Sequence, residues 1–354
     1  MKLSSLFKDK AYAFAQSGDP EDDCKFATAL LKKTNPELNI KHLALWSVTD
    51  YYDVFMILTA NQELLKLKIS LSDPDHVLEK ESVVLRRSHC PALPILVDYG
   101  TSKIGEEVTY LLARVPAGEN VRSQGRSCLI NNLDLFLKSY WVFAKSHNVK
   151  PTYKKVITYF TKNLIPQNVL GKESLEALED YTDSDLCEKF LLDLRADILS
   201  RFKDIQKKLN KKCHAALSLD SIFYYGGGFY FDELHNVCMG HPYIDFCDMV
   251  IESGSPPEND IYLWKQFCDS GSFPQDRDLY DKIYQLCLRK KLADLLISYI
   301  KEVYVYDSFR YEEIFHVADS FSHAYTRFQE IESFSENKDF IMKTICEPIF
   351  GVKA

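Results

Sequence analysis

Glycine is scarce in the first part of this 354-residue sequence, and none occurs between Gly18 and Gly100. A loop that folds closely over a phosphate group usually needs glycine, which lets the backbone approach and leaves N–H groups for the anion. This stretch therefore predicts no glycine-rich phosphate loop. The chain also contains no Walker-type phosphate loop and no Gly-x-Ser-x-Gly nucleophile elbow.

The sequence also lacks paired cysteines, long apolar runs and an excess of positive charge. Its ten cysteines include no Cys-x-x-Cys pair, which indicates reduced thiols and a cytoplasmic protein. No apolar run approaches the roughly 18 residues of a membrane span, so we expect no membrane partner. The formal net charge of −8 disfavours a nucleic-acid partner, because phosphates attract basic surfaces.

The N-terminal third predicts one helix followed by a series of strands. Asp19-Pro20 opens the helix, with aspartate as the cap and proline in the first turn, and Asn35-Pro36 ends it. The expected strands are His42–Trp46, Val54–Thr59, Leu64–Ile69, Pro94–Asp98 with a turn at Tyr99-Gly100, and Thr109–Arg114.

A second helix, starting near Asp73-Pro74, carries a glutamate on its apolar side. Glu81 lies three or four residues from the apolar positions of this helix, so we expect it to face inward. A glutamate on a buried side needs a cation. The third strand offers Lys66 and Lys68, whose alternation alone would also fit a solvated strand face.

An apolar hairpin follows further along the chain. Ile222–Tyr225 and Phe229–Phe231 are two short strands, and Gly226-Gly227-Gly228 supplies the turn between them. Asp232 follows directly after the second strand. Because the hairpin is so apolar, we expect it to pack against the rest of the protein.

The remaining C-terminal sequence is mostly helical. We expect helices at Leu129–His147, Asp183–Asn210, Tyr280–Val303 and Tyr311–Ile331. The polar segment between the first two helices could cover a cleft. His235, Cys238 and His241 have ligand-like spacing, with Cys247 as a fourth candidate for zinc, but nothing else in the sequence supports a metal there.

The stretch 214–245 resembles the catalytic core of the aminoglycoside phosphotransferase and choline kinase family. In this family the catalytic core has the motif His-Gly-Asp-Leu-His-Pro-x-Asn-Ile, followed by a hairpin and the motif Ile-Asp-Trp-Glu. The motifs Gly-Asp-Pro and Asp-Leu come next. The matching residues are His214, Leu217, Ile222, Asp232, Gly240, Pro242 and Asp245. The resemblance implies an α+β, bilobal protein-kinase-like fold, with a small β-rich lobe over residues 1–117 and a mostly helical large lobe over 118–354.

The resemblance also implies a nucleotide site. The strand lysine, Lys68 or in another register Lys66, would pair with Glu81. The hinge backbone from Leu112 to Arg114 would bond adenine, and Val115-Pro116-Ala-Gly118-Glu119 resembles the hinge and the Pro-Gly that follows it in the family. Asp245 would begin a helix and anchor the backbone of the His214 loop.

The same alignment leaves several catalytic positions altered. The catalytic aspartate falls on Ala216 and the metal-binding asparagine on Ser221. Asp232, with Asp220 beside the lost asparagine position, could still hold one magnesium ion. The turn from Ser47 to Asp53 has no glycine and carries Asp50 and Asp53, which would repel a triphosphate. Binding of ATP and magnesium is therefore expected to be weak or absent.

Three functions fit this sequence. The first is a degenerate kinase, a pseudokinase that binds an unidentified protein or small-molecule partner. The second is an atypical ATP-dependent phosphotransferase that acts on a small molecule or a protein. The third is a structural or assembly component that keeps only the scaffold, because a fold does not fix a function.

Overall fold

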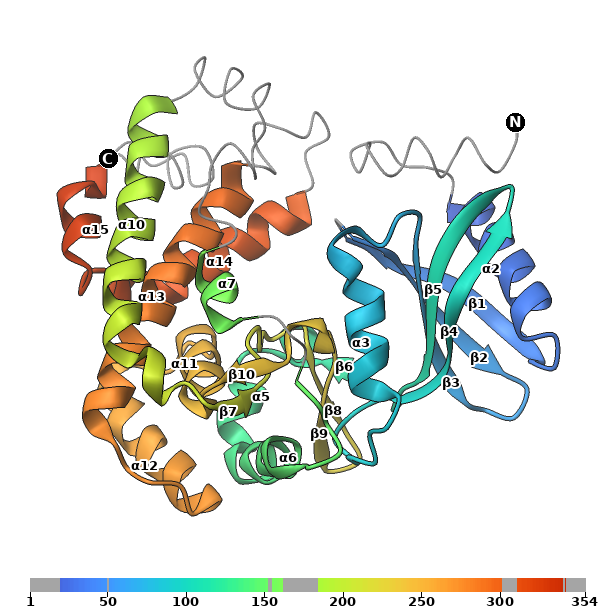
Figure 1. Ribbon diagram of the computed structural model, residues 1–354, viewed down its shortest axis with the longest axis horizontal. Coiled ribbons are helices and arrows are strands. Elements are labelled where there is room, and N and C mark those ends of the chain that lie inside the picture. The colour runs from blue at the N-terminus through green and yellow to red at the C-terminus, as the bar shows by residue number, and fades with distance from the viewer. Residues whose placement is uncertain are drawn as a thin grey trace. The chain divides into compact units, whose positions relative to one another are not determined.

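The computed structural model describes residues 20–49, 51–151, 155–161, 184–300, 311–339 and 341 (Figure 1). The chain divides into two compact units. The first comprises Met1–Asn120, Ser139–Thr152 and Ser221–Val237, and the second comprises Val121–Lys138, Tyr153–Asp220 and Cys238–Ala354.

The first unit is built on a five-stranded antiparallel sheet with the strand order β1-β2-β3-β5-β4. The strands are β1 (Ile40–Val48), β2 (Asp53–Thr59), β3 (Leu64–Ser70), β4 (Ile95–Ile104) and β5 (Glu106–Arg114). Helix α2 (Pro20–Thr34) lies along one side of this sheet and α3 (Val77–Leu85) along the other (Figure 1). All five strands and both helices overlap the ranges that the sequence predicts.

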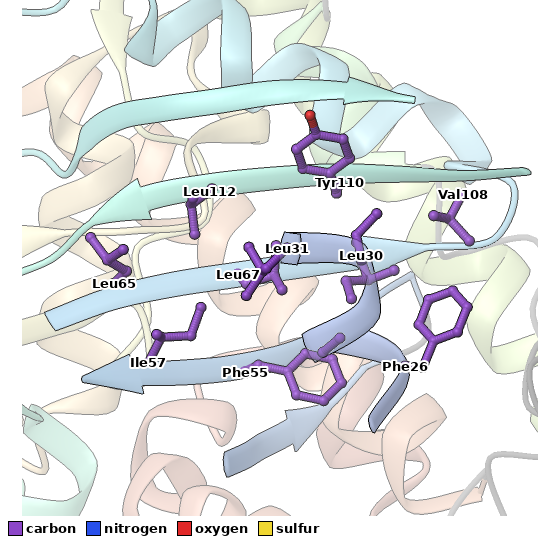
Figure 2. Packing of buried hydrophobic residues seen from close by; sticks show 12 residues of the cluster. Phe26, Leu30, Leu31, Phe55, Ile57, Leu65, Leu67, Val108, Tyr110 and Leu112 are labelled. Atoms are coloured by element: carbon purple, nitrogen blue, oxygen red, sulfur yellow. The ribbon is translucent and has the colours of Figure 1, made fainter. Parts of the chain in front are cut away.

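Helix α2 and one face of the sheet form the apolar core of this unit. Phe26, Leu30 and Leu31 of the helix pack on alternate residues of β2, β3 and β5, as Figure 2 shows. Those strand residues are Phe55, Ile57, Leu65, Leu67, Ile69, Val108, Tyr110 and Leu112, each no more than 5% exposed. Because side chains alternate along a strand, Lys66 and Lys68 of β3 point to the opposite face.

The start of helix α3 is fixed by an aspartate before it. Asp73 accepts hydrogen bonds from the backbone N–H groups of Leu78 (2.8 Å) and Glu79 (3.1 Å). A short 3₁₀ turn, Pro74–His76, precedes the helix. The capping carboxylate satisfies N–H groups that have no partner inside the helix, which positions the buried Glu81 one turn further on.

Two local predictions are wrong in their boundaries. The turn expected at Tyr99-Gly100 is part of β4, where Gly100 pairs with Tyr110 of β5. The turn lies instead at Gly105, whose φ of 78° suits glycine. The helix expected at Leu129–His147 is two helices, α5 (Ser127–Asn131) and α6 (Leu133–Lys145), separated at Asn132.

The predicted hairpin is present in the first unit as β8 (Ile222–Tyr225) and β9 (Gly228–Phe231). Gly226 and Gly227 make the turn with positive φ, whereas Gly228 begins the second strand. The two-residue β6 (Glu119–Asn120) pairs with β8. Phe231 packs on the aromatic rings of Tyr140 and Phe143, so the hairpin does lie on an apolar body.

The second unit is mostly helical. Its longer helices are α10 (Ser184–Ile205), α11 (Pro242–Glu252), α12 (Asp260–Gly271), α13 (Arg277–Ile300) and α14 (Tyr311–Phe328), with the shorter α4 (Val121–Gln124), α7 (Val156–Thr161) and α15 (Glu332–Glu336). A small two-stranded sheet joins β7 (Lys211–Cys213) to β10 (Cys238–Gly240). Asp183, residues 301–303 and most of the polar segment after α6 lie outside the described residues. Among the described helices, none is long and apolar enough to cross a membrane.

Candidate functional site

Two lysines of β3 lie buried on the face of the sheet opposite α2. Lys66 is 8% exposed and Lys68 is 2% exposed. The alternative that both lysines lie on a solvated strand face is therefore wrong. Since an ammonium group is costly to bury alone, each of these side chains needs an anionic partner in the first unit.

Lys68 is the lysine that pairs with the helix glutamate. Its Nζ donates to both carboxylate oxygens of Glu81, at 2.8 Å each. Asp232 lies 3.3 Å away on another side, and the ring of Tyr52 lies 5.0 Å from the Nζ atom. Burial alone would lower the pKa of Lys68, but the carboxylates of Asp232 and Glu81 outweigh it and raise that pKa. The expected Lys68–Glu81 ion pair is thus present.

Lys66 also reaches a carboxylate, which belongs to Asp232. Its Nζ donates to Asp232 Oδ2 and lies 4.7 Å from the centre of the Phe223 ring, a cation–π contact. Asp232 follows β9, and its backbone N–H donates to Ser221 O at 2.9 Å. The two oxygens of Asp232 therefore each face a different lysine.

The electrostatics of this cluster favour a permanently ionised Asp232. Burial would raise the pKa of the carboxyl, but the charges of Lys66 and Lys68 hold it well below its usual range. Glu81 differs, because burial raises its pKa to about 7 in spite of Lys68, and the nearby Asp232 carboxylate adds to the rise. With Glu81 ionised, two ammonium groups and two carboxylates balance in charge.

The turn before β2 is held by hydrogen bonds of its own and contacts Lys68 through Tyr52. The hydroxyl of Thr49 accepts hydrogen bonds from the backbone N–H groups of Tyr51 (3.2 Å) and Tyr52 (3.0 Å). A side chain of the turn thus satisfies these N–H groups, as in other hydroxyl-capped turns. Tyr52 is 4% exposed and its ring covers Lys68. Asp50 lies outside the described residues, and Asp53 is the first residue of β2.

A small pocket adjoins the lysine cluster within the first unit. Its lining residues are Met56, Lys66, Pro94, Val115, Pro116, Gly118, Phe223, Tyr230, Phe231 and Asp232. Lys66 and Asp232 are the charged residues of its lining, and the other lining residues are apolar or aromatic side chains and a glycine.

The residues predicted to bond adenine lie in β5, between β3 and the edge strand β4. Leu112 and Arg114 of β5 pair with β3 on one side and β4 on the other. The next N–H group, of Val115, donates to Leu64 O at 3.0 Å. Adenine contacts at these residues stay a prediction, and this double pairing is a geometric argument against them.

In the second unit, the loop that follows β7 is anchored as the resemblance implies. The backbone N–H groups of His214 and Ala215 each donate to a different oxygen of Asp245, at 2.8 Å. Asp245 is fully buried in the first turn of α11. The expected anchoring of the loop by Asp245 is thus confirmed. Ala216 is the next residue of the loop after the two anchored ones.

Asp220, the other candidate metal ligand, is also occupied. Its two carboxylate oxygens accept hydrogen bonds from Arg122 Nε at 2.8 and 2.9 Å. Magnesium prefers one or two free carboxylates together with water and phosphate oxygens. In the first unit Asp232 is paired with two ammonium groups, so this carboxylate does not fit a magnesium ion. In the second unit the Asp220 side chain is 47% exposed and carries one guanidinium.

The zinc-like spacing does not assemble into a metal centre. In the described part of the chain, no group of three or more histidine, cysteine, aspartate or glutamate side chains could hold a metal ion. Cys238 lies against Cys213, with the sulfur atoms 3.8 Å apart. His241 caps α11, because its Nδ1 accepts the N–H of Tyr243 at 3.2 Å.

Solved structures resemble this chain, whereas no protein-family model and no curated protein matches it. A thermostable mutant of aminoglycoside phosphotransferase APH(4)-Ia has a TM-score of 0.57 at 11% identity, covering 84% of this chain and 98% of that one. A choline/ethanolamine kinase family protein from Mesorhizobium loti has a TM-score of 0.55 at 14% identity, covering 91% and 98%. Aminoglycoside phosphotransferase APH(3'')-Id from Streptomyces rimosus, in complex with ADP and streptomycin, has a TM-score of 0.52 at 16% identity, covering 73% and 96%.

These similarities define a protein-kinase-like fold. The expected fold class, an α+β protein with a β-rich N-terminal part and a mostly helical C-terminal part, is confirmed. The resemblance to aminoglycoside and choline phosphotransferases is confirmed at the level of the fold. Because all three sequence identities are low, the structural similarity supports the fold assignment and says nothing about the activity of this chain.

Sequence reasoning missed three contacts of the site. The pairing of Lys66 with Asp232 joins residues 166 positions apart, and no local sequence pattern predicts it. The Arg122–Asp220 pair spans 98 positions. The position of Tyr52 over Lys68 had one available signal, because the turn carries aromatic residues where a phosphate loop would carry glycine.

Proposed function

We propose that this chain is a pseudokinase, a protein with a kinase fold that acts by binding a partner and does not transfer phosphate. One observation carries the proposal: both oxygens of Asp232 are bound by lysines of the same unit. In active kinases the equivalent aspartate holds magnesium on the phosphates of ATP. Two ammonium groups beside this carboxylate would repel a magnesium ion, which supports a chain that does not use the metal.

The altered catalytic loop supports the same proposal. Because Asp245 anchors the loop, Ala216 stands where the resemblance has the catalytic aspartate. A methyl group cannot accept a proton or orient a hydroxyl, and losing a general base typically costs a factor of about 10²–10⁴. Ser221, at the asparagine position, is fully buried.

A second candidate is an atypical ATP-dependent phosphotransferase acting on a small molecule or a protein. The observation that favours it is the intact Lys68–Glu81 pair, which active protein kinases require. It ranks second, because the same lysine also faces Asp232 and lies under Tyr52. A pure assembly component has no observation of its own in its favour.

The proposed partner and location rest on the sequence composition alone. The net charge of −8 supports a protein or small-molecule partner over a nucleic acid. The lack of a Cys-x-x-Cys pair in the sequence supports a cytoplasmic location.

A transfer assay with ATP labelled at the γ-phosphate tests the proposal. It measures autophosphorylation, ATP hydrolysis and transfer to amino-alcohols, aminoglycosides and proteins, with Asp232→Ala as the matched control. We expect label transfer at background level for both chains. Transfer that exceeds background and disappears in Asp232→Ala would falsify the pseudokinase proposal and favour the atypical enzyme.

A further inference from the structure

Asp232 is the carboxylate around which the charges of the first unit are arranged. It lies at the end of β9 and is 6% exposed. Lys66 Nζ binds its Oδ2 atom, and Lys68 Nζ lies 3.3 Å from its Oδ1 atom. A carboxylate in this position is the natural place for a cation, and here both cations come from the chain itself.

The two lysines do not have equivalent surroundings. Lys68 is bound to both oxygens of Glu81 as well as facing Asp232, so it belongs to a strand-to-helix ion pair. The described polar contact of Lys66 is Asp232, and its other neighbour is the ring of Phe223. Lys66 also lines the small pocket beside the cluster, as does Asp232.

We propose that Lys66 takes the place of a divalent metal ion at Asp232, and so makes this site independent of metals. The ammonium group supplies a positive charge on the oxygen that a metal would use, and it is tethered by strand β3. A divalent cation would have to displace it or accept two ammonium groups as close neighbours, which is electrostatically unfavourable.

The proposal predicts that removing the tethered charge creates a metal site. In Lys66→Ala, the Oδ2 atom of Asp232 loses its ammonium partner while Lys68 keeps the carboxylate ionised. The fold should survive, because Asp232 still has one cation and Lys66 lies at the wall of a pocket. Lys66→Gln is a second neutral variant that keeps more of the side-chain volume, and Lys66→Arg preserves the charge.

Manganese(II) is the probe, and electron paramagnetic resonance of the free ion measures its binding to the full chain. We expect no saturable site in the wild-type chain or in Lys66→Arg. In Lys66→Ala and Lys66→Gln we expect one saturable site, with a dissociation constant on the order of 10⁻⁴–10⁻³ M, as in weak oxygen-ligand sites. Adding Asp232→Asn to Lys66→Ala should abolish the site.

Two results overturn the proposal. One is a saturable manganese site in the wild-type chain that disappears in Asp232→Asn, which requires no change at Lys66. The other is manganese binding no tighter than wild type in both neutral variants when circular dichroism shows them folded. The inference goes beyond the proposed function, and phosphate transfer by the wild-type chain would contradict the pseudokinase proposal without changing the manganese result.

Discussion

Replacing Glu81 with alanine tests the ion pair at the centre of the first unit. Glu81 is 1% exposed, and both of its carboxylate oxygens accept from Lys68, which is 2% exposed. The variant would leave the Lys68 ammonium buried with Asp232 as its remaining carboxylate neighbour, 3.3 Å away.

The size of the effect follows from burial. Removing one partner of a buried ion pair typically costs roughly 3–5 kcal/mol, because the other charge stays buried. Since Asp232 still compensates part of the Lys68 charge, we expect the lower end, about 3 kcal/mol. Glu79→Ala is the matched control on the same helix: Glu79 pairs with His76 at the surface, with 54% of its side chain exposed. A surface pair is worth roughly 0–1 kcal/mol.

Urea unfolding at neutral pH measures both variants. Trp46 and Trp141 belong to the first unit and Trp264 to the second, so tryptophan fluorescence should be compared with far-UV circular dichroism. Coincident transitions justify a single free energy of unfolding. Equal losses in Glu81→Ala and Glu79→Ala would contradict this prediction, because they would mean that the Lys68–Glu81 contact contributes no more than a surface pair.

The remaining predictions concern pH and the second unit. Because burial raises the pKa of Glu81 from 4.5 to about 7, ionising this carboxyl in the folded chain should lower the free energy of unfolding as pH rises from about 4.5 to 7, and Glu81→Gln should lack this pH dependence. Asp245→Asn should cost about 3 kcal/mol in urea melts, because the carboxylate accepts two backbone N–H groups. Asp248→Asn should cost less than about 1 kcal/mol at pH 7, because burial raises the pKa of Asp248 to about 8 and its carboxyl is already largely protonated; equal losses in the two asparagine variants would contradict this. Arg327→Ala should cost roughly 3–5 kcal/mol by stranding the buried Asp260, whereas Lys282→Ala on an exposed helix face should change stability by less than about 1 kcal/mol; similar midpoints for this pair of variants would count against the buried-charge argument.

Local patterns in the sequence were enough to predict several parts of the site. Helical spacing alone placed Glu81 on the buried side of α3, and the resemblance supplied Lys68 as its partner. The aspartate in the first turn of α11, Asp245, was predicted to hold the His214 loop by the same resemblance. Both contacts involve a residue that a repeating pattern or a motif fixes within its own element.

The rest of the site depends on which elements meet in the folded chain. Strand alternation puts Lys66 and Lys68 on one face but cannot say which carboxylate each will reach, because Asp232 arrives from a hairpin more than 160 positions away. Likewise, Gly100 has the residue type of a turn, yet pairing with Tyr110 keeps it in β4. In both cases tertiary contacts decided between alternatives that local sequence left open.

Titration calorimetry with ATP, with and without magnesium, would show whether the chain binds the nucleotide through a metal ion at Asp232. We expect no magnesium-dependent heat of binding, because Lys66 and Lys68 hold Asp232 and the ring of Tyr52 lies against Lys68. The contradicting result is saturable binding at sub-millimolar ATP that requires magnesium in the wild-type chain and loses that requirement in Asp232→Ala.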